Sequence, residues 1–114
     1  MTIRLKRVYE ALSKEDGRRI LVDRLWPRGL SKEKVHVDLW LKEIAPSNEL
    51  RKWFAHDPAK WAEFKRRYRA ELQKNPAPLA LLRSEARQGP VTLIYGASDE
   101  QHNQAVVLLE LLKH

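Results

Sequence analysis

The sequence predicts an α/β protein with a small, at least partly parallel sheet of about four strands and helices packed on its faces. Two short segments, residues 19–22 and 91–95, contain continuous apolar runs typical of strands that are covered on both sides. The longer segments between them repeat apolar residues at helical spacing. Because strands alternate with helices and no repeat or linker divides the chain, we expect a single domain over residues 1–114.

The first third of the chain predicts three strands. Residues 3–9 begin with alternating apolar and basic side chains, which indicates a half-exposed strand near an edge of the sheet. Residues 19–22 follow a polar turn around Gly17 and predict a central strand. Residues 35–41 alternate strictly between two faces, which predicts a further strand or extended segment.

The middle of the chain predicts three helices. Ser47 is a suitable cap for a short helix that ends near His56. Asp57 followed by Pro58 predicts the start of a long helix, because the carboxylate can accept free N–H groups and proline is tolerated at the first helical position. A third helix is predicted to end at Gly89. The long helix should pack on the core through one stripe, formed by Trp61, Phe64, Tyr68 and Leu72.

The last unit is a strand over residues 91–95 followed by a terminal helix within "GASDEQHNQAVVLLELLKH". Ser98 and Gln101 have the spacing of a capping box, which predicts that the helix begins there. Asp99 would then lie in the first turn, where its charge suits the helix dipole but repels a bound phosphate.

Composition and charge limit the possible functions. The chain has no cysteine, which excludes disulfides, thiolate metal sites and a cysteine nucleophile. Its 22 basic and 15 acidic residues give a formal charge of +7, so contact with a polyanion is electrostatically easy. No N-terminal leader pattern and no run of membrane-spanning length is present, so we expect a cytoplasmic protein without a membrane partner.

Several motifs together resemble those of a known family. They are "RILVDRLWPRG", "LWLKEIAPS", "LRKWFAHDP", "WAEFKRRYRAEL" and "VTLIYGASDEQHNQAVVLLELL". In this order they resemble the YeaO-like proteins, a bacterial family catalogued as domain of unknown function 488, over nearly the whole chain. The resemblance implies a small cytoplasmic α/β protein. It implies no reaction, substrate or cofactor, so function has to be argued from the residues.

Polar side chains follow both of the most apolar strands, at the end where open parallel sheets bind ligands. If the two strands are parallel neighbours, the polar groups converge and form a site for a small anionic ligand, either phosphate-bearing or nucleotide-like. Arginine forks suit phosphate or carboxylate oxygens, and an indole can stack on a flat ligand. The predicted ligand-binding residues are Arg24, Trp26, Arg28, Tyr95 and Asn103.

A purely structural interpretation of the same residues is also open. Asp23 can pair with Arg24 or with another arginine, and Trp26 can fill the core. "WPRG" fits a type I turn with Pro27 at its second position and Gly29 at its fourth, and this turn would fix the directions of the neighbouring side chains.

A hydrolase acting on a phosphorylated substrate is a second hypothesis. Its acid, base or metal-binding groups would be Asp23, His56, Asp99 and His102, because these titratable residues lie at the ends of elements rather than in apolar stripes. Structural roles compete with this hypothesis, since Asp57 beside His56 is already explained as a helix cap. No established metal-binding motif is present, and neither a metal nor a cofactor is predicted.

Nucleic-acid binding is a third hypothesis. The segment "KWAEFKRRYRAEL" concentrates basic side chains on one helix, namely Lys65, Arg66, Arg67 and Arg69, which could contact phosphates. A solvated helix face explains the same pattern. Because no helix-turn-helix or RNA-binding motif accompanies it, this hypothesis ranks below the ligand pocket.

Overall fold

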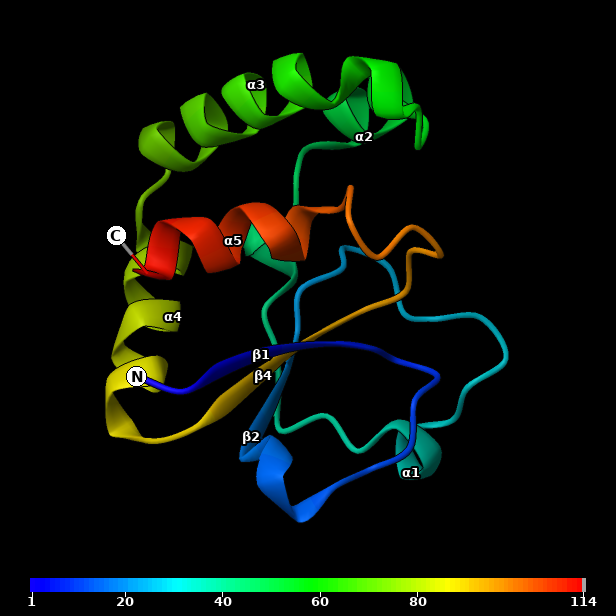
Figure 1. Cartoon of the computed structure of the whole chain (residues 1–114), viewed down its shortest axis with the longest axis vertical. Coiled ribbons are helices and arrows are strands. Elements are labelled where there is room, and N and C mark those ends of the chain that lie inside the picture. Colours follow the sequence, from blue (N-terminus) through cyan, green and yellow to red (C-terminus); the bar gives the residue numbers. More distant parts are fainter. Residues whose placement is uncertain (114) are drawn as a thin grey trace.

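A four-stranded parallel sheet forms the centre of the protein, whose computed structural model describes residues 1–113 (Figure 1). The strands follow the order β1-β4-β2-β3 across the sheet, and every neighbouring pair is parallel. The α/β prediction is therefore confirmed, with β1 at an edge and β2 inside the sheet as expected. The strands are β1 (Ile3–Arg7), β2 (Arg18–Leu21), β3 (Leu39–Trp40) and β4 (Val91–Tyr95).

Helices connect the strands and cover the sheet. The α-helices are α1 (Lys32–Val35), α2 (Asn48–Phe54), α3 (Trp61–Lys74), α4 (Ala77–Gln88) and α5 (Gln104–Lys113), and single 3-10 turns occur at η1 (Lys14–Asp16), η2 (Lys42–Ile44) and η3 (Pro58–Lys60). Within residues 1–113, none of these helices has both the length and the apolar content needed to cross a bilayer.

The two faces of the sheet are covered differently because successive strand residues point to opposite sides. Ile20 of β2 and Leu93 of β4 belong to the main core, together with side chains from α2, α3, α4 and α5. Leu21 and Ile94 point to the other face, where a smaller cluster forms with α1 and the segment of residues 26–40. Figure 1 shows α2, α3 and α5 on one side of the strands and α1 on the other.

The predicted cap at Ser47 is confirmed, whereas Asp57 caps the 3-10 turn η3, which leads directly into α3 at Trp61. The Ser47 hydroxyl accepts a hydrogen bond from the Leu50 N–H at 3.1 Å, and the Asp57 carboxylate accepts one from the Ala59 N–H at 3.0 Å. The predicted core stripe of α3 is also confirmed, since Phe64, Tyr68 and Leu72 are buried and Trp61 packs against them from a half-buried position.

The predicted strand or extended segment over residues 35–41 is wrong at Val35 and His36, and only its end forms a strand. The Ser31 hydroxyl accepts a hydrogen bond from the Lys34 N–H at 3.3 Å and starts the short helix α1, which ends at His36 in a left-handed conformation with φ of 47°. Only Leu39 and Trp40 pair with β2. An alternating pattern therefore arose here from a helix cap followed by a two-residue strand, which periodicity alone does not distinguish.

The predicted start of the terminal helix is also wrong. Helix α5 begins at Gln104, where the side-chain oxygen of Asn103 accepts a hydrogen bond from the Val106 N–H at 3.2 Å. Asp99 instead caps a separate turn by accepting from the N–H groups of Gln101 and His102. His114, the last residue of the segment in which the helix was predicted, lies outside the described residues.

A buried ion network joins the start of β2 to its neighbours. The Arg19 guanidinium donates to the Asp16 carboxylate at 2.5 Å and to the backbone oxygens of Val35 and His36 at 3.1 and 2.9 Å. The Lys6 ammonium donates to the other Asp16 oxygen at 3.0 Å. Asp16 and Arg19 are each only 3% exposed, so this network connects β1, η1, β2 and α1 inside the protein.

Candidate functional site

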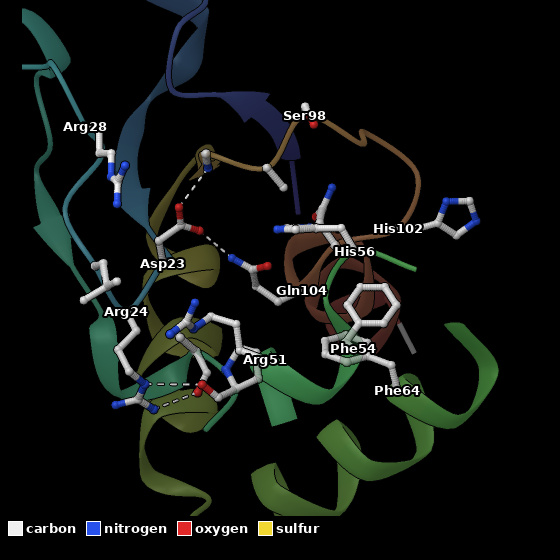
Figure 2. Close-up of a pocket in the computed structure, with 16 residues that line it drawn as sticks. Asp23, Arg24, Arg28, Arg51, Phe54, His56, Phe64, Ser98, His102 and Gln104 are labelled. Carbon is white, nitrogen blue, oxygen red and sulfur yellow. Dashed lines mark hydrogen bonds between the residues drawn. The ribbon is translucent and has the colours of Figure 1, made fainter. Parts of the chain in front are cut away.

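A cavity of about 460 Å³ opens at the carboxyl ends of β2 and β4 (Figure 2). These two strands are parallel neighbours, so the segments that follow them, residues 23–28 and 96–104, lie side by side. Helix α2 contributes a third wall, and α3 closes part of the cavity with Phe64. The cavity therefore lies where open parallel sheets generally bind ligands.

Asp23 connects the two segments at the centre of the cavity. One of its carboxylate oxygens accepts a hydrogen bond from the Gly96 N–H at 2.8 Å, and the other accepts one from the Gln104 side chain. Burial raises the pKa of Asp23, while the donors on Gly96 and Gln104 and the nearby His56 oppose that rise. The Asp23 carboxyl thus fixes the start of the β4–α5 loop relative to β2.

Arg24 has a structural role in addition to lining the cavity. Its guanidinium donates to the backbone oxygens of Ala45 at 3.0 Å and Pro46 at 3.3 Å, as the dashed lines in Figure 2 show. It forms no ion pair with Asp23 among the described residues, so the alternative in which Asp23 pairs with Arg24 does not occur. Arg24 therefore holds the segment that leads into α2.

Two other arginines line the cavity without a carboxylate partner. Arg28 follows β2 and Arg51 comes from α2, and both side chains are exposed. None of the ion pairs formed within residues 1–113 involves either guanidinium. Arg51 was not predicted, because it lies on a helix rather than at a strand end. Only the position of α2 beside the sheet brings it to the cavity.

The remaining wall of the cavity is largely apolar. The rings of Phe54 and Phe64 stack with their centroids 4.3 Å apart, and both side chains are buried in the main core except where they face the cavity. Leu25 also lines the cavity and is 63% exposed, which is unusual for a leucine. The site thus combines cationic groups with a substantial apolar surface.

Both predicted histidines reach the cavity, in different environments. The His102 Nδ1 lies 2.9 Å from an Asp99 carboxylate oxygen, and its ring meets Trp61 edge to face at 5.2 Å. Hydrogen bonds from the Gln101 N–H and from His102 lower the pKa of Asp99. His56 is exposed and has a left-handed backbone with φ of 57°, which is uncommon for a residue with a side chain.

The hydrolytic groups predicted from the sequence are only partly brought together. Asp23, His56 and His102 line the cavity, whereas Asp99 lies behind His102 and contacts it from the loop. In the part of the chain that the structure describes, no group of three or more His, Asp or Glu side chains is placed to hold a metal ion.

Two predicted ligand contacts lie outside the cavity. Trp26 packs edge to face on Trp40 at 5.4 Å and donates to the Leu30 backbone oxygen at 2.7 Å, on the other face of the sheet. Tyr95 is buried, with 3% exposed. The core interpretation of Trp26 is therefore the correct one. The predicted turn is displaced by one residue, because the chain turns at Arg28 and Gly29, so that Gly29, with a φ of 76°, takes the third position.

Asn103 lines the cavity, but its side-chain oxygen and nitrogen already form hydrogen bonds within the protein. Its side-chain oxygen caps α5, and its amide donates to the Asp99 backbone oxygen at 2.9 Å. The residue is 2% exposed. Asn103 therefore supports the loop around the cavity from within the protein.

Four basic side chains of α3 pair with two nearby carboxylates, Glu63 and Glu110. Arg66 and Arg67 both donate to Glu63, and their charges and hydrogen bonds lower the pKa of Glu63 to about 2. Lys65 and Arg69 pair with Glu110 of α5 at 3.4 and 2.9 Å. This arrangement is the one expected of a solvated helix face.

Comparisons with known proteins give a consistent result. A family model described as "Inactive DUF488-N3 subclade" matches residues 2–114. "Uncharacterized protein YeaO" of Escherichia coli (strain K12) is 44% identical over 113 residues, which cover 99% of this chain and 98% of that protein. "Uncharacterized protein Rv3073c" of Mycobacterium tuberculosis (strain ATCC 25618 / H37Rv) is 42% identical over 110 residues, which cover 96% and 92% respectively. No solved structure matches the chain.

Proposed function

The chain belongs to the YeaO-like DUF488 family, and from that premise we propose that it is a binding protein for a small anionic ligand, held in the cavity at the ends of β2 and β4. The observation that carries the proposal is the placement of Arg28 and Arg51, two guanidinium groups without a carboxylate partner among the described residues, on one cavity. The description of the matching family model as inactive favours binding over catalysis.

The charges around the cavity support an anionic ligand. Arg24, Arg28 and Arg51 line it, and Asp23 is the single carboxylate among the described lining residues. Guanidinium groups present paired N–H donors that match the oxygens of a phosphate or a carboxylate. The ligand class is therefore a phosphate-bearing or nucleotide-like small molecule.

The other two hypotheses have weaker support. A hydrolase would use His102, which Asp99 orients, but Asp23 is already held by Gly96 and Gln104. Nucleic-acid binding would use the basic face of α3, where Glu63 and Glu110 already pair with the cations. Arg28 and Arg51 have no such carboxylate contacts among the described residues.

The first test of this function replaces the free arginines. We expect Arg28→Gln and Arg51→Gln each to weaken the binding of inorganic phosphate by about tenfold, because each removes a charge-assisted hydrogen bond. Isothermal titration calorimetry would measure the affinity. Arg87→Gln, an exposed residue of α4 outside the cavity, is the matched control and should bind like the parent. Equal affinity in all four proteins would disprove the proposed role.

The second test concerns the charge of Asp23. We expect Asp23→Asn to increase the affinity for phosphate by about fivefold at neutral pH, because it removes a negative charge from the cavity and keeps an oxygen for the Gly96 N–H. Since burial raises the pKa of Asp23, the parent protein should also bind more tightly as the pH falls and Asp23 becomes neutral, whereas the variant should lack this contribution. Weaker binding by a folded Asp23→Asn protein would contradict an anion site at this place.

A further inference from the structure

The cavity has two chemically different sides. Figure 2 shows Arg24 and Arg28 on one side, Phe54 and Phe64 on the other, and Asp23 and Gln104 between them. All of these residues line the same cavity. A ligand that fills it therefore meets cationic groups at one end and aromatic side chains at the other.

The volume of the cavity also indicates a ligand larger than a bare anion. Its volume of about 460 Å³ falls within the range of about 300–1,000 Å³ that is usual for pockets holding drug-sized organic ligands. An inorganic phosphate held at the arginines would leave the aromatic side unfilled. The ligand that matches this cavity has an organic body attached to its anionic group.

The aromatic side is suited to a flat group. Phe54 stacks with Phe64, and the His56 ring lies 6.4 Å from the Phe54 ring between centroids. Aromatic rings favour partners that are also flat, through stacked or edge-to-face contacts. A ligand with an apolar body would also cover part of Leu25, which lines the cavity and is 63% exposed without it.

We infer that the ligand is an aromatic anion, with its acidic group on the cationic side of the cavity at Arg28 and its ring against Phe54, an inference that rests on the proposed function. Asp23 lies between the two sides, so its carboxylate, when charged, disfavours an anionic group in the middle of the cavity. Sugar phosphates and bare anions lack the flat apolar group that this arrangement accommodates.

The test compares three probes in the full chain by calorimetry: inorganic phosphate, methyl phosphate and phenyl phosphate, at one pH above the second pKa of both esters. Phenyl phosphate should bind at least about tenfold more tightly than methyl phosphate, because only its ring can bury apolar surface against Phe54. Phe54→Leu should reduce the ratio of the phenyl phosphate affinity to the methyl phosphate affinity.

Trp61→Leu is the matched control for Phe54→Leu. Trp61 belongs to the same aromatic cluster, 6.0 Å from Phe54 between ring centroids, but does not line the cavity, so its replacement should leave the preference for phenyl phosphate intact. Thermal unfolding would verify that both variants fold. If phenyl and methyl phosphate bind equally, and both lose affinity in Arg28→Gln, the aromatic inference is overturned while the proposed function stands. If no probe binds the parent protein, the aromatic inference and the proposed function are both wrong.

Discussion

Replacing Asp16 by asparagine is expected to destabilise the protein by about 3–5 kcal/mol at neutral pH, because it leaves the buried charge of Arg19 without its carboxylate partner. Arg19 is 3% exposed and cannot turn toward water without disrupting its bonds to the backbone of Val35 and His36. Urea unfolding, followed by circular dichroism, would measure the loss. Glu15→Gln is the control, since the neighbouring Glu15 side chain is 78% exposed.

The same experiment has a defined pH dependence. Burial alone would raise the pKa of Asp16, but hydrogen bonds from Lys6, the Ser13 N–H and Arg19 outweigh it and hold the pKa below its usual value of 3.8. A lowered pKa in the folded state stabilises the protein above the unfolded pKa, and this contribution is lost as the pH falls through the folded value. The difference between parent and Asp16→Asn should therefore shrink in acid. A difference under about 1 kcal/mol at neutral pH would contradict a stabilising network.

Replacing Gly17 by alanine is expected to lower the free energy of unfolding by a similar amount, roughly 3–5 kcal/mol, because the new side chain clashes with the backbone. Gly17 has φ of 63° and ψ of −139°, a conformation that residues with side chains rarely adopt. A Cβ at this position would lie 2.2 Å from the Pro90 backbone oxygen, and that oxygen is held close because it accepts a hydrogen bond from the Arg18 N–H at 3.0 Å. The turn into β2 would have to move away from β4.

Gly29→Ala separates the effect of backbone strain from the effect of the steric clash with Pro90. Gly29 also has a positive φ, of 76°, but a Cβ there would meet nothing within 4 Å. Its replacement should therefore cost only the backbone strain, about 1 kcal/mol. Chemical unfolding of both variants under the same conditions gives the comparison. Equal losses at Gly17 and Gly29 would show that the close approach to Pro90 has no energetic importance.

The fold was predictable from the sequence where one pattern had one physical explanation. The apolar segments that became β2 and β4 were long enough to be buried on both faces, and Ser47 and Asp57 were caps with a free N–H to accept from. Over residues 31–41 the same sequence pattern fits either one strand or a short helix followed by a short strand. Ser31 capped a short helix and Asp38 accepted a hydrogen bond from the Arg19 N–H at 2.8 Å, which broke the predicted strand.

Apart from His56, the residues of the candidate site were predictable only where they follow a strand. Asp23, Arg24 and Arg28 follow β2, and the sheet order was sufficient to bring them to the β4–α5 loop. Arg51, Phe54 and Phe64 come from helices whose placement against the sheet depends on tertiary packing, so local patterns gave no signal for them. Trp26 lies elsewhere, because its indole packs against Trp40 on the other face of the sheet, and the sequence does not report the direction of a side chain in a loop.

The sheet order has a consequence for how the chain folds during synthesis. Strand β4 lies between β1 and β2, and pairs Val91 with both Ile3 and Arg18, yet it is the last strand to leave the ribosome. Until it emerges, β1 and β2 have no partner that connects them, and only β2 and β3 can pair. Contacts that span nearly the whole chain form slowly because a long loop must close first. Nascent chains released before residue 91 therefore lack the strand that completes the sheet and expose apolar edges to chaperones and proteases.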